Sequence, residues 1–198
     1  MSEQKKSDQK KLRVYIPATV PMLRELVTHR ELTAIGGTAF AVTPALREAY
    51  ASGDDEELGE VAMSEAARAS LRLLAAERET MSGSESDPEP ENPDEAAPGA
   101  GGGPVYRRAV IAADVTGATL RPDLDDAVVR LAGSISYQQI ASVHVDLADA
   151  EPQVAKAVDV VDAADLGDPD AEFVLGDAED HQLAWYAAQE LPFLLELL

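Results

Sequence analysis

Two of the three histidines in this chain stand close to carboxylates, in spacings that could support chemistry. His144 and Asp146 are two residues apart in SVHVD, so an extended strand would place both side chains on one face. There the acid could orient the imidazole, or both groups could ligate a metal ion. His181 is a further candidate metal ligand. The alternative is an exposed polar face opposite two buried valines, because nothing in the sequence brings His181 near this strand.

Asp114 is the acid best placed to join these residues. It lies at the end of residues 108–115 (RAVIAADV), an apolar run typical of a strand covered on both faces. Ligands of open α/β sheets collect beyond the carboxyl ends of such strands. Asp114, His144 and Asp146 are therefore the candidate catalytic residues of a divergent metal-assisted hydrolase. A simple turn formed by Asp114 and Gly117 explains the same residues without any chemistry.

No recognised catalytic motif accompanies these candidates. The chain has no cysteine, which excludes thiol nucleophiles, disulfides and thiolate metal sites. It has no Gly-x-Ser-x-Gly elbow. The glycine run at 99–103 precedes a predicted strand, whereas a phosphate-binding loop must precede a helix. We therefore expect no cofactor.

The charge of the chain limits its partners. The net charge is −21 and the pI is about 4.3, so direct binding to the phosphates of nucleic acids is disfavoured. An acidic surface of this kind could instead mimic a nucleic acid and occupy a partner's basic groove. The longest apolar runs, such as 191–195 and 109–113, are well short of the ~20 residues that a membrane-spanning helix needs. We expect a cytoplasmic protein that does not insert into membranes.

Apolar periodicity and capping signals predict the elements of two blocks. In the first block, residues 12–81, we expect strands at 12–16 and 38–42 and helices from Thr19, from Thr43 to Tyr50, and from Asp54 to about Glu79. In the second block, residues 105–198, we expect strands at 108–115, 127–131, 142–147 and 172–175 and helices at 151–165 and from Ala178 to about Leu191.

Two polar segments flank the first block. Residues 1–11 form a lysine-containing tail that we expect to be disordered. Residues 82–104 are rich in proline, glycine and acids and have no apolar periodicity, so this insert is also predicted to be disordered. The alternating elements indicate an α/β (or α+β) fold. We expect a single layered domain whose mixed sheet has about five to six strands and is flanked by helices.

The C-terminus carries the best non-catalytic signal. The only tryptophan is predicted to project from the terminal helix, and an apolar end follows it. Such an end must dock on its own core or meet a partner, either a second copy or another protein. The candidate interaction residues are Trp185, Tyr186, Phe193, Leu194 and Leu197. Our leading interpretation is a non-catalytic cytoplasmic interaction or regulatory protein.

Several segments together resemble a known family. They are LRVYIPAT, TAFAVTPALREAYA, ARASLRLL, ASVHVDL, DAEF and LAWYAAQE, in this order. In them the chain resembles an uncharacterised actinobacterial family of conserved hypothetical proteins, a domain of unknown function. The resemblance implies a bacterial intracellular protein whose two blocks form one unit. It supplies no functional residues.

Overall fold

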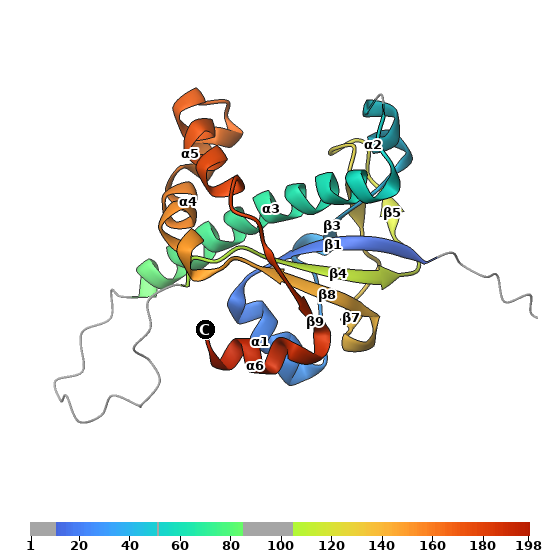
Figure 1. The fold of residues 1–198 in the computed structure, drawn as a ribbon, viewed down its shortest axis with the longest axis horizontal. Coiled ribbons are helices and arrows are strands. Elements are labelled where there is room, and N and C mark those ends of the chain that lie inside the picture. Colours follow the sequence, from blue (N-terminus) through green and yellow to red (C-terminus); the bar gives the residue numbers. More distant parts are fainter. Residues whose placement is uncertain (1–10, 51, 85–104) are drawn as a thin grey trace, which may run out of the picture.

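The computed structural model describes residues 11–50, 52–84 and 105–198. Its strands are β1 (Leu12–Ala18), β2 (Glu31–Leu32), β3 (Thr38–Ala41), β4 (Ala109–Val115), β5 (Thr119–Leu120), β6 (Val128–Arg130), β7 (Ile135–Ser136), β8 (Ile140–Val145) and β9 (Ala184–Ala187). Seven of them form one sheet in the order β5-β6-β3-β1-β4-β8-β9, and β2 pairs with β7 in a separate ribbon (Figure 1).

The sheet differs from the prediction in size and in direction. It has seven strands rather than five or six, and every neighbouring pair is antiparallel, so the sheet is not mixed. The expected strand at 108–115 is confirmed as the central β4, which is buried on both faces. Most of the two segments predicted to be disordered, 1–11 and 82–104, lies outside the described residues. The exceptions are Lys11 in the first segment and residues 82–84 in the second, which are helical.

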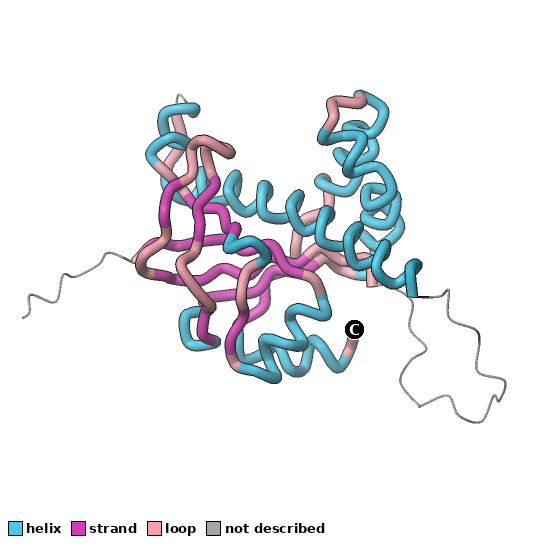
Figure 2. Tube along the Cα trace, turned by 180° about the vertical axis from the view of Figure 1, so that it is seen from behind, coloured by secondary structure: helices cyan, strands magenta, loops and turns pink. Residues whose placement is uncertain are grey.

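The helices cover both faces of the sheet, which confirms a layered domain of mixed α and β structure (Figure 2). They are α1 (Val20–His29), α2 (Pro44–Ala49), α3 (Asp55–Ser84), α4 (Glu151–Asp165), α5 (Pro169–Glu179) and α6 (Leu191–Glu196). The predicted cap of α2 is confirmed, because the Thr43 hydroxyl accepts a hydrogen bond from the Leu46 backbone N–H at 3.1 Å.

One face of the sheet packs against α1 and α6. Alternate residues of β1, including Val14 and Ile16, point to this face and meet Leu23 and Leu26 of α1, as the sequence pattern predicts. The strand expected at 12–16 is longer than predicted, because β1 continues through Pro17 to Ala18. β1 pairs with β3 only as far as Tyr15. Pro17, which has no backbone N–H, therefore removes no hydrogen bond between these two strands.

The other face packs against α3. Its alanines Ala62 and Ala66 meet Phe40 and Val110, and their small side chains let the helix lie close to the sheet. Gly59 allows the closest approach, because a Cβ atom at this position would lie 2.8 Å from the Tyr15 hydroxyl oxygen.

The helices α4 and α5 form a hairpin on α3. A second apolar core fills the space between the three helices, with Leu71, Val158 and Leu175 among its buried residues. The strand predicted at 172–175 is wrong, because this segment lies inside α5. The Asp168 side chain caps α5 by accepting hydrogen bonds from two backbone N–H groups, and Pro169 occupies the first turn.

The predicted terminal helix from Ala178 to Leu191 is also wrong. Its middle is the edge strand β9, and a separate short helix, α6, follows. Trp185 pairs with His144 and Tyr186 with Val143, so the two aromatic side chains point to opposite faces. The spacing of His181 and Trp185 resembles a helix, but pairing with a distant strand decides the structure.

Candidate functional site

Asp146 follows β8 and forms a buried ion pair with Arg108. Its Oδ1 and Oδ2 accept hydrogen bonds from Nη2 and Nε of the guanidinium, both at 2.8 Å, and Oδ2 also accepts one from the Arg108 backbone N–H. The two side chains are 0% and 2% exposed. Nη2 also donates to the carbonyl oxygen of His181 at 2.7 Å. Asp146 is therefore held by Arg108, and the pair ties together β4, β8 and the segment that leads into β9.

His144 lies on the face of β8 that points toward α3. Its Nε2 is 3.1 Å from the hydroxyl oxygen of Ser142. Burial lowers the pKa of the imidazole below its ordinary value of 6.5, so His144 is neutral at pH 7. The expected pairing with Asp146 is replaced by the Ser142 contact, since both oxygens of Asp146 face Arg108.

The structure places Asp114 away from His144. Opposite His144 on β4 lies Val110, whereas Asp114 lies opposite Arg13, about 13 Å further along the strand. Arg13 donates two hydrogen bonds to the Asp114 carboxylate, at 2.7 and 3.1 Å, and these bonds lower the pKa of that carboxyl group. Within the described residues, no group of three His, Asp or Glu side chains is placed to hold a metal ion.

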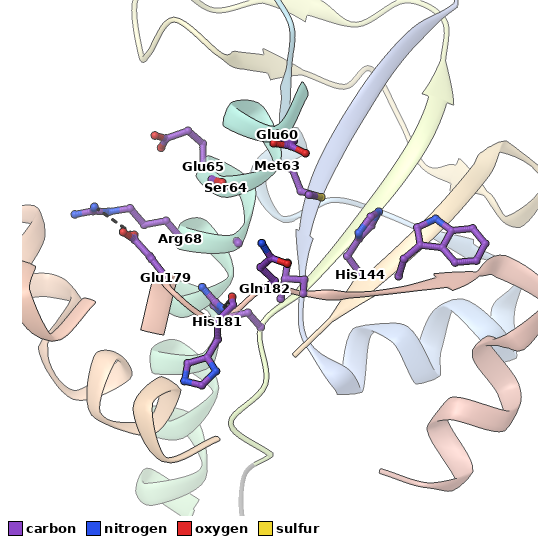
Figure 3. A pocket seen from close by; sticks show the side chains of 13 residues that line it. Glu60, Met63, Ser64, Glu65, Arg68, His144, Glu179, His181 and Gln182 are labelled. Carbon is purple, nitrogen blue, oxygen red and sulfur yellow. Dashed lines mark hydrogen bonds and ion pairs between the residues drawn. The ribbon is translucent and has the colours of Figure 1, made fainter. Parts of the chain in front are cut away.

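His144 and His181 both line a pocket of about 550 Å³ between α3, the edge of the sheet and the turn before β9, but the His181 ring points away from His144 (Figure 3). The floor carries His144 and Trp185, and the turn contributes His181, Gln182 and Leu183. The wall formed by α3 contains Glu60, Met63, Ser64, Glu65, Ala67 and Arg68. The remaining lining residues are Arg108 and Glu179.

The wall formed by α3 was not predicted from the sequence. A signal for it exists, because Glu60, Met63, Ser64 and Ala67 follow the i, i+3, i+4, i+7 spacing of a single helix face. This stripe runs beside the alanine stripe that packs on the sheet. It stays open because the principal sheet contacts of α3 are with β1, β3 and β4.

The pocket is acidic. Arg68 donates to Glu172 at 2.7 Å and lies 3.5 Å from Glu179, so its charge is compensated by two acids. Burial raises the pKa of Glu65, and the charge of Asp125 raises it further. Glu60 is exposed on the rim. Since Arg108 is also paired, the uncompensated charge of the lining is negative.

Comparison with known proteins agrees with the resemblance found in the sequence. The model of a family described as a family of unknown function, DUF6912, matches residues 12–195. The chain belongs to this family. No curated protein and no solved structure matches the chain. The DUF6912 match spans both blocks, and the predicted membership of a family of unknown function is confirmed, whereas the actinobacterial origin stays a prediction.

The candidate interaction residues of this DUF6912 member do not form one surface. Trp185 lines the pocket and is 61% exposed. Tyr186 and Leu194 pack into the core on the opposite face, and Phe193 and Leu197 are exposed on and just after α6. In the parts of the chain that the structure describes, no helix is long and apolar enough to cross a membrane.

Proposed function

We propose that this protein is a non-catalytic interaction protein that binds a partner polypeptide at the edge strand β9 and the adjoining pocket. The observation that carries the proposal is the position of Trp185. This large aromatic side chain is 61% exposed on the last strand of the sheet, beside a pocket of about 550 Å³.

Physical chemistry favours this position for binding. Tryptophan is among the residues that most often dominate the energy of protein interfaces, because it buries a large area with few rotatable bonds. An edge strand also presents backbone groups that another chain can pair with. The four residues of β9 are enough for a short ladder and too few for extensive edge-to-edge aggregation.

The geometry gives the hydrolase alternative no comparable support. Asp114 is bonded to Arg13, and Asp146 is bonded to Arg108. The Ser142 hydroxyl lies 3.1 Å from the His144 imidazole, which is the spacing of a nucleophile and its base. Ser142 is buried, however, and within the described residues no carboxylate is bonded to the imidazole to orient it. The idea of an acidic nucleic-acid mimic rests on net charge alone.

The proposal is tested by comparing Trp185→Ala with Phe173→Ala. Phe173 is 74% exposed on α5, so both substitutions remove an exposed aromatic side chain and leave the core intact. Proteins captured from the native cells by the two variants and by the wild-type chain are quantified side by side. We expect Trp185→Ala to lose partners that the other two chains retain. Equal recovery by all three chains would contradict the proposal.

A further inference from the structure

We propose that the partner presents an extended, basic segment that adds to β9 as a new strand and places an arginine or lysine side chain beside Trp185. This inference rests on the proposed function and names the chemistry of the partner. It is carried by the backbone alternation of β8 and β9 together with the uncompensated acidic charge of the pocket.

The backbone groups of Trp185 point toward the open edge. The Asp146 backbone N–H donates to the Arg108 carbonyl oxygen at 3.0 Å, which fixes Asp146 as a residue whose backbone faces β4. Antiparallel strands alternate, so the backbone of His144 faces β4 too and that of Val143 faces β9. His144 and Trp185 are therefore a non-hydrogen-bonded pair. The N–H and C=O groups of Trp185 consequently point away from β8.

An independent contact supports the same alternation. Ala187, two residues after Trp185, donates its backbone N–H to the Glu190 side chain at 2.8 Å rather than to β8. Residues two apart in a strand point their backbone groups the same way. Trp185 thus offers a donor and an acceptor together at a sheet edge that no strand of the described residues covers, which is the arrangement that an added strand uses.

The pairing fixes where the partner's side chain would lie. A residue that exchanges both hydrogen bonds with Trp185 must have its side chain on the same face of the sheet, with the two Cβ atoms ~5 Å apart. That face carries the pocket, so the partner's side chain would enter beside the indole ring. Glu60 and Met63 of α3 and His144 of β8 line the same pocket as Trp185 (Figure 3).

Charge complementarity selects a basic side chain. Glu60 is exposed, and in the described part of the chain no arginine forms an ion pair with it, whereas Arg68 and Arg108 are each paired with acids. His144 is neutral at pH 7 and does not oppose a cation. Met63 and Leu183 can cover the aliphatic stem, and the indole face attracts an ammonium or guanidinium group. A second copy of this chain is disfavoured as the occupant, because each copy carries a net charge of −21.

The experiment uses the full chain and the fluorescence of its single tryptophan, which is Trp185 itself. The probes are capped peptides without tryptophan in which valine alternates with arginine, and matched peptides with glutamate in place of arginine. We expect the arginine peptide to shift the emission and to bind, and the glutamate peptide to do neither. Backbone N-methylation of the central arginine should weaken binding about fivefold, since it removes a ladder donor.

A matched pair of variants tests the acidic wall. Glu60→Gln should weaken binding of the arginine peptide about threefold, whereas Glu196→Gln, which removes the same charge from α6 on the opposite face, should not. Equal binding of both peptides, or equal effects of the two variants, would overturn the inference. So would an emission shift that depends on protein concentration alone, which would indicate a second copy. If Trp185→Ala loses its partners but the arginine peptide does not bind, the basic segment is refuted and the proposed function stands.

Discussion

Arg108 and Asp146 form a fully buried ion pair whose guanidinium also donates to the carbonyl oxygen of His181. The pair closes the end of the β4–β8 ladder and anchors the segment that leads into β9. The position of Trp185 at the sheet edge therefore depends on a contact between residues that are 38 positions apart in the chain.

Breaking this pair should be costly. Asp146→Asn removes the charge that compensates buried Arg108, so we expect the free energy of unfolding to fall by about 3–5 kcal/mol. Replacing both residues, Arg108→Met with Asp146→Leu, should be milder, because no uncompensated charge is left. Urea denaturation followed by circular dichroism measures both effects. The exposed pair of Arg13 and Asp114 provides the control, and Asp114→Asn should cost less than about 1 kcal/mol. Similar losses of unfolding free energy for Asp146→Asn and Asp114→Asn would contradict the claim that the Arg108–Asp146 pair is buried.

His144 should make stability depend on pH. Burial lowers its pKa in the folded chain below 6.5, so the unfolded chain binds this proton more readily. The resulting contribution to stability is present above pH 6.5 and is lost as the pH falls from 6.5 toward the pKa of the folded state. The difference in unfolding free energy between wild type and His144→Gln should therefore shrink over this window. A difference that stays constant from pH 7.5 to 5 would contradict the buried neutral imidazole.

Gly59 and Tyr15 should be energetically coupled. An alanine in a helix interior normally stabilises it by up to about 1 kcal/mol relative to glycine, but here the new Cβ atom would lie 2.8 Å from the Tyr15 hydroxyl oxygen. We expect Gly59→Ala to be more favourable in a Tyr15→Phe background than in the wild-type chain by about 1 kcal/mol or more. Thermal unfolding of the four proteins of this double-mutant cycle measures the coupling. Additive effects would show that the tyrosine moves aside freely.

Asp168 should stabilise the start of α5 through its side-chain cap. Asp168→Ala leaves two backbone N–H groups without their acceptor, so we expect a loss of about 1 kcal/mol in unfolding free energy. Asp168→Asn keeps a capping oxygen and should recover most of this stability. Equal losses of unfolding free energy for the two variants would show that the charge of Asp168, and not its capping hydrogen bonds, stabilises the helix.

Local signals predicted the local structure well. The helix Glu151–Asp165 and the cap at Thr43 were both expected from the sequence and are confirmed. The error at 172–175 is also local in origin, because the cap and proline at Asp168 and Pro169 were not recognised as a helix start. The error at β9 has a different cause, since Trp185 becomes part of a strand only through pairing with His144.

The candidate site could be predicted in part. His144, His181 and Trp185 were all singled out from the sequence and line the pocket, but their surroundings were not predicted. Asp146 is bonded to Arg108 instead of His144, and α3 supplies one wall of the pocket. The stripe beginning at Glu60 has a helical spacing that the sequence shows, yet only the packing of α3 reveals which face stays open. The outward backbone of Trp185 follows from strand register, which no local pattern encodes.

The most direct test of the account is the amide hydrogen exchange of β9, measured residue by residue by NMR. We predict fast exchange for the Trp185 amide in the free protein and slow exchange for the Tyr186 amide, which faces β8. Adding the arginine peptide should slow exchange at Trp185 and leave Tyr186 unchanged. A Trp185 amide that is already protected in the free protein, or that is unaffected by the peptide, would contradict the proposal that a partner strand adds to β9.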